Sequence, residues 1–308
     1  MDQQRPSMDH SKQETVGIIG LGIMGSALAD QLISKGFSVF GIDPSNKARN
    51  RAKQAGVEVV PSIDVLLRHS HKLLSSLPSN EAFESICDAL LQARAEASQT
   101  SNVILAETST LPIDIKQKQE RRLARAGIQL LDCPLSGTGA QARVGDVVVY
   151  ASGSSKAISS MMPVFKGFSR AQVNVGKFGN GMRMKLVANL LVAIHNVAAA
   201  EAVLLGKRLG LDASDVVRVV GDGAGSSRML QVRGPLMAKR NWQDATMKVS
   251  IWQKDMSIIG QALAQTSTPA PLFAACAPIY HAAQALGLGE QDTASVMAVL
   301  EQMAGMKP

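Results

Sequence analysis

A glycine-rich segment near the start of the chain has the spacing of a phosphate-binding turn. Gly20, Gly22 and Gly25 follow the apolar run 15–19 in the pattern Gly-x-Gly-x-x-Gly. In such a turn the first glycine bends the chain, the second lets the backbone approach a pyrophosphate, and the third lets a helix pack on the sheet. Amides at the start of that helix bind the phosphates. The pattern predicts a dinucleotide held by Gly20, Leu21, Gly22, Ile23, Met24 and Gly25.

An acidic residue follows the next apolar run, where it can meet the adenosine ribose. Asp43 stands 18 residues after Gly25, and its carboxylate can accept both ribose hydroxyls. Its negative charge repels a 2′-phosphate, so we expect NAD, while Lys47 and Arg49 nearby keep NADP as an alternative. The other interpretation is that residues 43–46 are only a helix-capping turn.

Two further segments combine polar groups with a defined geometry. The Ser136 hydroxyl and the amides of Gly137 and Thr138 stand where a strand is expected to run into a helix, so they can converge on a carboxylate. A serine N-cap without a ligand is the alternative. Lys185 and Asn189 are four residues apart, on one face of an almost wholly apolar helix. A solvated lysine is the alternative there.

These segments resemble the β-hydroxyacid dehydrogenase family, over essentially the whole chain after its first residues. Residues 132–145 read DCPLSGTGAQARVG and are similar to the family's substrate signature D-x-P-V-S-G-G-x-x-x-A-x-x-G, with Thr138 at the second glycine. Residues 179–189 read GNGMRMKLVAN and are similar to its G-x-G-x-x-x-K-x-x-x-N. The family includes 3-hydroxyisobutyrate dehydrogenases, tartronate semialdehyde reductases and L-threonate dehydrogenases.

The resemblance implies roles for the matching residues. Lys185 is expected to be the general acid/base that takes the hydroxyl proton as hydride leaves the alcohol carbon. Burial against the cofactor would lower the pKa of this lysine into a useful range. Asn189 is expected to bind the substrate or hold the amine. Ser136, Gly137 and Thr138 are expected to bind the substrate carboxylate, where the Thr138 side chain either narrows the pocket or adds a hydroxyl.

Shorter matches extend the expected cofactor site. Leu77 and Pro78 resemble a turn beside the cofactor, and Thr110 resembles a threonine near the nicotinamide ribose, although Glu107 stands where the family usually has aspartate. Lys254-Asp255 resembles a Lys-Asp pair in the family's helical domain.

Adjacent helical residues diverge by about 100°, so we expect Lys254 rather than Asp255 to reach the cofactor. A solvated charge pair is the alternative. Arg228 is a weaker candidate for pairing with the substrate carboxylate.

Alternating strand and helix patterns indicate the fold. Strand-like runs occur at residues 15–19, 37–42, 72–77, 103–106, 128–131 and 147–151, and helical patterns occur at 24–35 and at about 79–96 and 112–126. We therefore expect a Rossmann-type, doubly wound parallel α/β domain over residues 15–178. Beyond it the patterns are all helical, at about 181–209, 213–221, 226–239, 248–264, 271–286 and 292–304. Residues 179–308 are expected to form an all-α domain joined by a long interdomain helix, and residues 1–14 a flexible tail.

Composition limits the partners. The 308 residues are 46% hydrophobic and 19% charged, as in ordinary globular proteins. The net charge of +7 is dispersed and there are only two Trp and two Tyr, so we expect no nucleic acid partner and interpret the charge as attraction for an anionic cofactor and substrate. The apolar stretch 186–200 is short for a membrane span, and residues 1–14 lack the apolar core of a signal peptide.

We therefore expect a cytoplasmic protein without a membrane partner, forming a homodimer or homotetramer. Cys87, Cys133 and Cys276 lack the spacing of disulfide or zinc sites, so each is expected to be a small core residue and no metal is expected.

The expected activity is the NAD(P)-dependent interconversion of a short β-hydroxy acid and its semialdehyde. One alternative is a physiological reductase of glyoxylate, succinic semialdehyde or tartronate semialdehyde. Two others are an imine reductase and a non-catalytic dinucleotide-binding scaffold, both of which are expected to differ at Lys185.

Overall fold

The computed structural model describes residues 14–96 and 102–306. The chain divides into two compact units, Met1–Met182 and Arg183–Pro308. Most of the expected tail lies outside the described residues, but Glu14 forms an ion pair with Lys72 and accepts a hydrogen bond from the Ser38 amide at 3.1 Å. The last residue of the expected tail is thus tied to the first unit.

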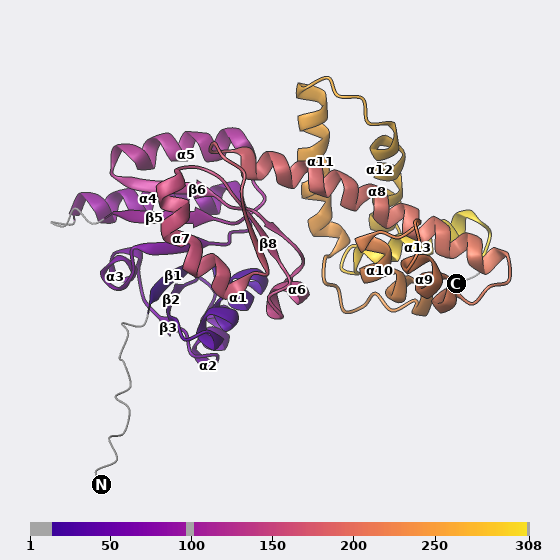
Figure 1. Ribbon diagram of the computed structural model, residues 1–308, viewed down its shortest axis with the longest axis horizontal. Helices are drawn as coiled ribbons and strands as arrows, with labels where there is room; N and C mark the ends of the chain where they lie inside the picture. The colour runs from indigo at the N-terminus through magenta and orange to yellow at the C-terminus, as the bar shows by residue number, and fades with distance from the viewer. Residues whose placement is uncertain (1–13, 97–101, 307–308) are drawn as a thin grey trace, which may run out of the picture. The chain divides into compact units, whose positions relative to one another are not determined.

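A parallel sheet forms the centre of the first unit, as the sequence predicts (Figure 1). Within the described residues its six strands have the order β3-β2-β1-β4-β5-β6. They are β1 (Thr15–Ile19), β2 (Ser38–Ile42), β3 (Glu58–Val59), β4 (Lys72–Ser75), β5 (Val103–Glu107) and β6 (Ile128–Asp132). The strand order reverses between β1 and β4, and in such sheets ligands bind beyond the strand ends at this point. The glycine turn follows β1 there.

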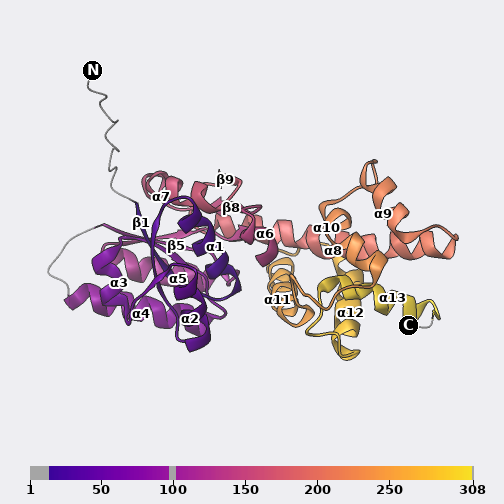
Figure 2. The same ribbon diagram turned by 90° about the horizontal axis from the view of Figure 1, so that it is seen from below.

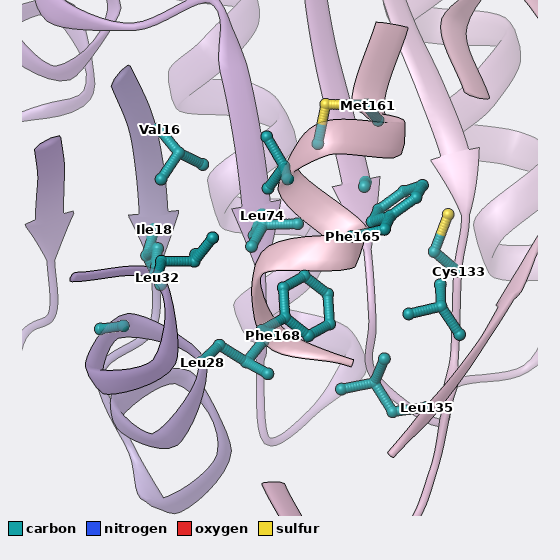
Figure 3. Packing of buried hydrophobic residues seen from close by; sticks show 14 of the residues in the cluster. Val16, Ile18, Leu28, Leu32, Leu74, Cys133, Leu135, Met161, Phe165 and Phe168 are labelled. Carbon is teal, nitrogen blue, oxygen red and sulfur yellow. The ribbon is translucent and has the colours of Figure 1, made fainter. Parts of the chain in front are cut away.

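Helices cover both faces of the sheet. On one face, α1 (Ile23–Ser34) and α7 (Ser155–Phe168) pack on the strands through a core that includes Leu28, Phe165 and Phe168 (Figure 3). On the other face, α3 (Ile63–His69), α4 (Asn80–Glu96) and α5 (Ile113–Arg125) bury Phe83 and Leu123. The helix α2 (Asn46–Gln54) lies between β2 and β3 along the chain.

The run at residues 147–151 is not part of the main sheet, contrary to the sequence prediction. It forms β8 (Val148–Ala151), which pairs antiparallel with β7 (Leu135–Ser136) and parallel with β9 (Ala171–Asn174). The helix α6 (Gly139–Arg143) connects β7 to β8. An isolated antiparallel bridge between Asp132 and Ser152 connects β6 to the end of β8. Apolar character shows that such a run is buried but not which sheet it joins.

The second unit is helical in its described part (Figure 2). The helix α8 (Asn180–Arg208) begins in the first unit and continues into the second. It is followed by α9 (Ala213–Gly221), α10 (Arg228–Lys239), α11 (Val249–Gln265), α12 (Pro271–Ala285), a 3₁₀ turn (Thr293–Ser295) and α13 (Val296–Met303). Residues of α8, including Val197 and Val203, pack with Trp252 and Tyr280 in the core of this unit.

The helix α8 coincides with the helical pattern expected at about 181–209 and contains the apolar stretch 186–200. Among the described helices it alone is long and apolar enough to cross a membrane by length and composition, with 39% of its most apolar window buried. A core helix of a soluble protein passes the same test. Large apolar side chains at Met184, Val187, Leu191 and Leu205 are exposed along it.

Candidate active site

The glycine turn has the backbone geometry that its spacing predicts. Gly20 has φ +91°, and a Cβ there would lie 2.3 Å from the Ser76 carbonyl oxygen. A Cβ at Gly25 would lie 1.8 Å from the Gly20 carbonyl oxygen. Gly22, the N-cap of α1, has no neighbouring atom within 4 Å of such a position. Two of the glycines are thus required by packing, while the third faces open space at a helix N-terminus, where a phosphate can bind.

Asp43 braces this turn from the end of β2. Its Oδ2 accepts a hydrogen bond from the Leu21 amide at 2.7 Å, and its Oδ1 accepts one from the Ser45 amide at 2.7 Å. The capping turn weighed in the sequence is therefore present. A carboxylate offers about four acceptor positions, so two remain for ribose hydroxyls. Asp43 can therefore hold the capping turn and bind a ribose at the same time.

Basic residues of α2 lie against the same turn. The Arg51 guanidinium donates to the carbonyl oxygens of Leu21 at 2.8 Å and Gly22 at 3.1 Å. Arg49 donates to the carbonyl oxygen of Asp43 at 2.8 Å. Arg51 was not predicted, because it lies in a strongly polar segment in which no pattern distinguishes one arginine from another. It places positive charge beside the expected ribose and phosphate positions.

The two shorter cofactor matches meet in the structure. The Leu77 amide donates to Ser109 Oγ at 2.7 Å, so the turn at Leu77-Pro78 is fixed against the loop that contains Thr110. Ser109 is buried, while Pro78 is exposed and Thr110 is half-buried. These loops follow β4, which pairs with β1 across the order reversal, and β5, which pairs with β4.

A fully buried group of three charges supports these loops. Lys116 Nζ lies 2.6 Å from Glu107 Oε2 and 2.8 Å from Asp132 Oδ1, and it also donates to the Ser109 carbonyl oxygen at 2.8 Å. Burial alone would lower the pKa of Lys116, but the two carboxylates raise it to about 12. Lys116 therefore stays charged. Glu107, noted in the sequence only as a departure from the family, is one of its partners.

Asp132 also holds the start of α8. Its Oδ2 accepts hydrogen bonds from the Met182 amide at 2.8 Å and from Ser152 Oγ at 3.1 Å. The Gly181 amide in turn donates to Ser152 Oγ at 3.0 Å. The first turn of α8 is thus fixed to the strand ends of the first unit.

The expected carboxylate segment forms the turn between β7 and α6. Gly137 has φ +142° and needs to be glycine, because a Cβ would lie 2.7 Å from Val147 Cγ1. Ser136 is half-buried, and neither its hydroxyl nor the Gly137 amide has a hydrogen-bond partner among the described residues. A Cβ at Gly139 would lie 2.5 Å from Ile23 Cγ2. The segment therefore packs directly on the glycine turn.

The polar groups of Thr138 take part in capping α6. Thr138 is buried, and its Oγ1 accepts from the Gln141 amide at 3.4 Å. Its own amide donates to Gln141 Oε1 at 3.0 Å. This reciprocal pair is a capping box for α6. The Thr138 hydroxyl and amide are both engaged within the chain.

In the second unit, Lys185 and Asn189 are buried on one face of α8. Lys185 is 9% exposed and Asn189 is 4% exposed. Asn189 Nδ2 donates to Asp255 Oδ2 at 2.9 Å. Burial lowers the pKa of Lys185; nearby Asp255 opposes this shift and Lys254 adds to it. Burial also raises the pKa of Asp255, against the influence of Lys185, Lys254 and Asn189.

Both members of the Lys254-Asp255 pair lie close to Lys185. Lys254 is exposed, whereas Asp255 is 6% exposed and bonded to Asn189. Asp255 was not predicted, because only one of two adjacent helical residues was expected to point toward the site. Lys254 and Asp255 diverge by about 100° around their helix, but both can still approach Lys185, because a long lysine side chain can bridge that angular separation.

The structure also places Arg228 and the three cysteines. Arg228 is exposed at the start of α10. Cys87, Cys133 and Cys276 are free and buried, so they are core residues, as expected. No group of His, Cys, Asp or Glu in the described part of the chain has an arrangement that could hold a metal ion.

A dinucleotide turn on a parallel sheet, followed by a helical unit with a buried lysine, is typical of nicotinamide-dependent dehydrogenases. A family model described as the NAD binding domain of 6-phosphogluconate dehydrogenase matches residues 15–178. A second, described as the NAD-binding of NADP-dependent 3-hydroxyisobutyrate dehydrogenase, matches residues 179–300. The chain belongs to the β-hydroxyacid dehydrogenase family.

Two relatives and a solved structure are similar to this chain over nearly its full length. L-threonate dehydrogenase of Cupriavidus necator is 30% identical, with 92% of this chain and 95% of that protein covered. 2-(Hydroxymethyl)glutarate dehydrogenase of Eubacterium barkeri is 24% identical, with 96% and 97% covered. The structure of Mycobacterium tuberculosis 3-hydroxyisobutyrate dehydrogenase with L-serine has a TM-score of 0.81 at 24% identity, with 94% and 99% covered.

Proposed function

We propose that this protein oxidises a short β-hydroxy acid to its semialdehyde, or reduces that semialdehyde, with Lys185 as the general acid/base. The observation that carries the proposal is the burial of Lys185 and Asn189 on α8, together with the buried Asp255 of α11 that accepts a hydrogen bond from Asn189. A buried amine with a lowered pKa can take and return a proton near neutral pH. Surface lysines, with their ordinary pKa, are poor bases for this step.

The other proposed site residues bind and orient the substrate and the cofactor. Ser136 Oγ and the Gly137 amide bind the substrate carboxylate, Asn189 orients the amine or the substrate hydroxyl, and the glycine turn binds the pyrophosphate. Thr110, Leu77 and Pro78 border the nicotinamide end, and Lys254 contributes positive charge toward the cofactor. When bound, the nicotinamide accepts a hydride from the alcohol carbon or returns one to the aldehyde.

The cofactor we propose is NAD. Asp43 directs its carboxylate to the glycine turn, and a 2′-phosphate beside it would be repelled. Arg49 and Arg51 supply positive charge in the same region, and one matching family model carries an NADP-dependent enzyme in its description. NADP is therefore the alternative, and the ratio of kcat/KM for the two cofactors decides between them.

The alternative functions differ from the proposed one in the direction of the reaction or in the class of protein. A physiological reductase of glyoxylate or of succinic or tartronate semialdehyde would use the same residues, with Lys185 donating rather than accepting the proton. A non-catalytic scaffold needs no buried lysine, so Lys185 favours an enzyme. We also propose that the protein acts as a homo-oligomer in the cytoplasm, where buried free cysteines such as Cys133 persist.

The test is a spectrophotometric panel with NAD and NADP over 3-hydroxyisobutyrate, glycerate, threonate and 4-hydroxybutyrate, with the matching aldehydes in the reverse direction. We expect at least one acid to be oxidised. The Lys185→Ala variant should lose turnover by a factor of about 100 or more, while the affinity for NADH, measured by fluorescence titration, stays nearly normal. Turnover by this variant at the wild-type rate would refute the role of Lys185, and silence across the panel would favour the scaffold.

A further inference from the structure

The segment proposed to bind the substrate carboxylate contains three potential donors, and one of them is already occupied. Ser136 Oγ and the Gly137 amide have no hydrogen-bond partner among the described residues. The Thr138 amide is the third donor, and it is held by Gln141 Oε1 at 3.0 Å. A side chain of this protein thus sits where an anionic ligand would otherwise bind.

Gln141 is fixed in that place from its other end. Its Nε2 donates to Asp146 Oδ2 at 3.0 Å, and the other oxygen of Asp146 accepts from Arg170 Nε at 2.7 Å. With Oε1 on the Thr138 amide and Nε2 on Asp146, both ends of the Gln141 amide group are used. A ligand that took the Thr138 amide would have to break this arrangement.

Thr138 and Gln141 bond to each other in both directions. Thr138 Oγ1 accepts from the Gln141 amide, which orients the first turn of α6 so that the Gln141 side chain folds back over the N-cap. A glycine at position 138 has no side-chain oxygen and could not complete this box. The side chain that departs from the family signature and the glutamine three residues later therefore work as a pair.

We infer that Gln141 determines how this site binds an acid: it closes the Thr138 amide, so the carboxylate is held by the Ser136 hydroxyl and the Gly137 amide alone. This inference rests on the proposed function, because it refines the carboxylate site that the function requires. The expected consequence is weaker, more selective binding of simple carboxylates than three open donors would give. Affinity must then come from other groups of the substrate.

The test uses isobutyrate, a short carboxylate without a reactive hydroxyl, as the probe. Its dissociation constant is measured by isothermal titration calorimetry on the full chain saturated with NADH. Gln141→Met keeps the length of the side chain but removes the acceptor, which opens the Thr138 amide. We expect isobutyrate to bind about tenfold more tightly to this variant, the change that one added hydrogen bond to a charged group brings.

Two controls make the result specific. Gln172→Met makes the same substitution in β9, where the side chain bonds to Ser169 and to no other described residue, and should leave the dissociation constant unchanged. Gln141→Ala opens the same amide with a smaller side chain and should also bind isobutyrate more tightly, so the inference stays testable if the methionine variant folds poorly.

Ser136→Ala separates failure of this inference from failure of the proposed function. Loss of the hydroxyl should weaken isobutyrate binding about tenfold whatever Gln141 does. Unchanged binding by Ser136→Ala would overturn the carboxylate site itself. Weaker binding by Ser136→Ala, combined with unchanged or weaker binding by both Gln141 variants, would overturn only the role of Gln141.

Discussion

Two neighbouring side chains act in opposite directions on the proton of Lys185. Its pKa is lowered by burial and by Lys254, while the carboxylate of Asp255 favours the charged amine and raises it. In oxidation of the alcohol, the uncharged amine is the active form, so kcat/KM should fall as the pH drops below the pKa of Lys185. The pH at which kcat/KM falls therefore reports the balance between the effects of Asp255 and Lys254 on the pKa of Lys185.

Asp255→Asn should move the acidic limb of kcat/KM to lower pH, because it removes the negative charge that stabilises the protonated amine. Lys254→Met should move the limb to higher pH, because it removes a repelling positive charge. The measurement is the pH dependence of kcat/KM for the best acid of the panel. Shifts of both variants in the same direction would contradict this account of Lys185.

The three glycines of the dinucleotide turn should respond differently to alanine. Gly22→Ala has an ordinary φ of −64° and open space for its Cβ, so thermal stability should hardly change. The methyl group would occupy the space proposed for the pyrophosphate, so NADH affinity should fall at least about tenfold, which is about 1.4 kcal/mol.

Gly25→Ala is the counterpart, because its Cβ would collide with the Gly20 carbonyl oxygen. It should cost about 2 kcal/mol or more of folding stability. Thermal unfolding and NADH titration of the two variants provide the comparison. Equal loss of stability in both would show that Gly22 is structural as well.

At the level of the elements, one buried cation connects two strand ends. Lys116 of α5 contacts the ends of β5 and β6 through Glu107 and Asp132. Removing one partner of a buried charge group leaves the others unpaired and typically costs about 3–5 kcal/mol. Lys116→Met should lose stability on this scale in urea denaturation.

Lys118→Met is the matched control, two residues along the same helix. Lys118 pairs with Glu84 at 3.2 Å, and its side chain is 63% exposed, so its loss should change stability by no more than about 1 kcal/mol. A similar small change in Lys116→Met would mean that the buried group contributes little net stability.

The regular elements could be predicted because their patterns are local. Apolar runs predicted β1, β2, β4, β5 and β6, and helical spacing predicted α1, α8 and most of the second unit. The strands β3 and β9 were missed because they are short, lie at sheet edges and contain exposed residues such as Glu58 and Asn174. The helices α2, α3 and α7 were missed because the segments between the apolar runs were treated only as connections.

The residues of the candidate site likewise divide into those that the sequence predicts and those that it does not. The glycine turn, Lys185 and Asn189 were found because their spacing in the chain carries the information. Asp255, Arg51 and Gln141 could not be assigned, since their roles depend on contacts with residues far along the chain or on a backbone amide that a sequence does not display.

For the whole molecule, the exposed apolar side chains along α8 indicate an interface. Leu205 is 60% exposed, and Met184, Val187 and Leu191 are exposed at helical spacing on the same element. We expect a second copy of the chain to cover part of this face, and the protein to be a dimer or tetramer without detergent. Leu205→Glu should shift the mass measured by light scattering toward the monomer.

Leu272→Glu on α12 is the control, because this leucine is also exposed, at 65%. It should leave the mass unchanged. A monomeric wild-type protein, or one recovered only with membranes, would show that the α8 face has a different role.

The anchoring of the first turn of α8 bears on how this protein could be recombined with its relatives. The family models meet between residues 178 and 179, yet the Gly181 and Met182 amides bond to Ser152 and Asp132 of the first unit. A chimaera joined after residue 178 would import that turn from another lineage. One joined after Met182 would inherit it intact. The better crossover point for exchanging the second unit is therefore inside the helix, one turn after it begins.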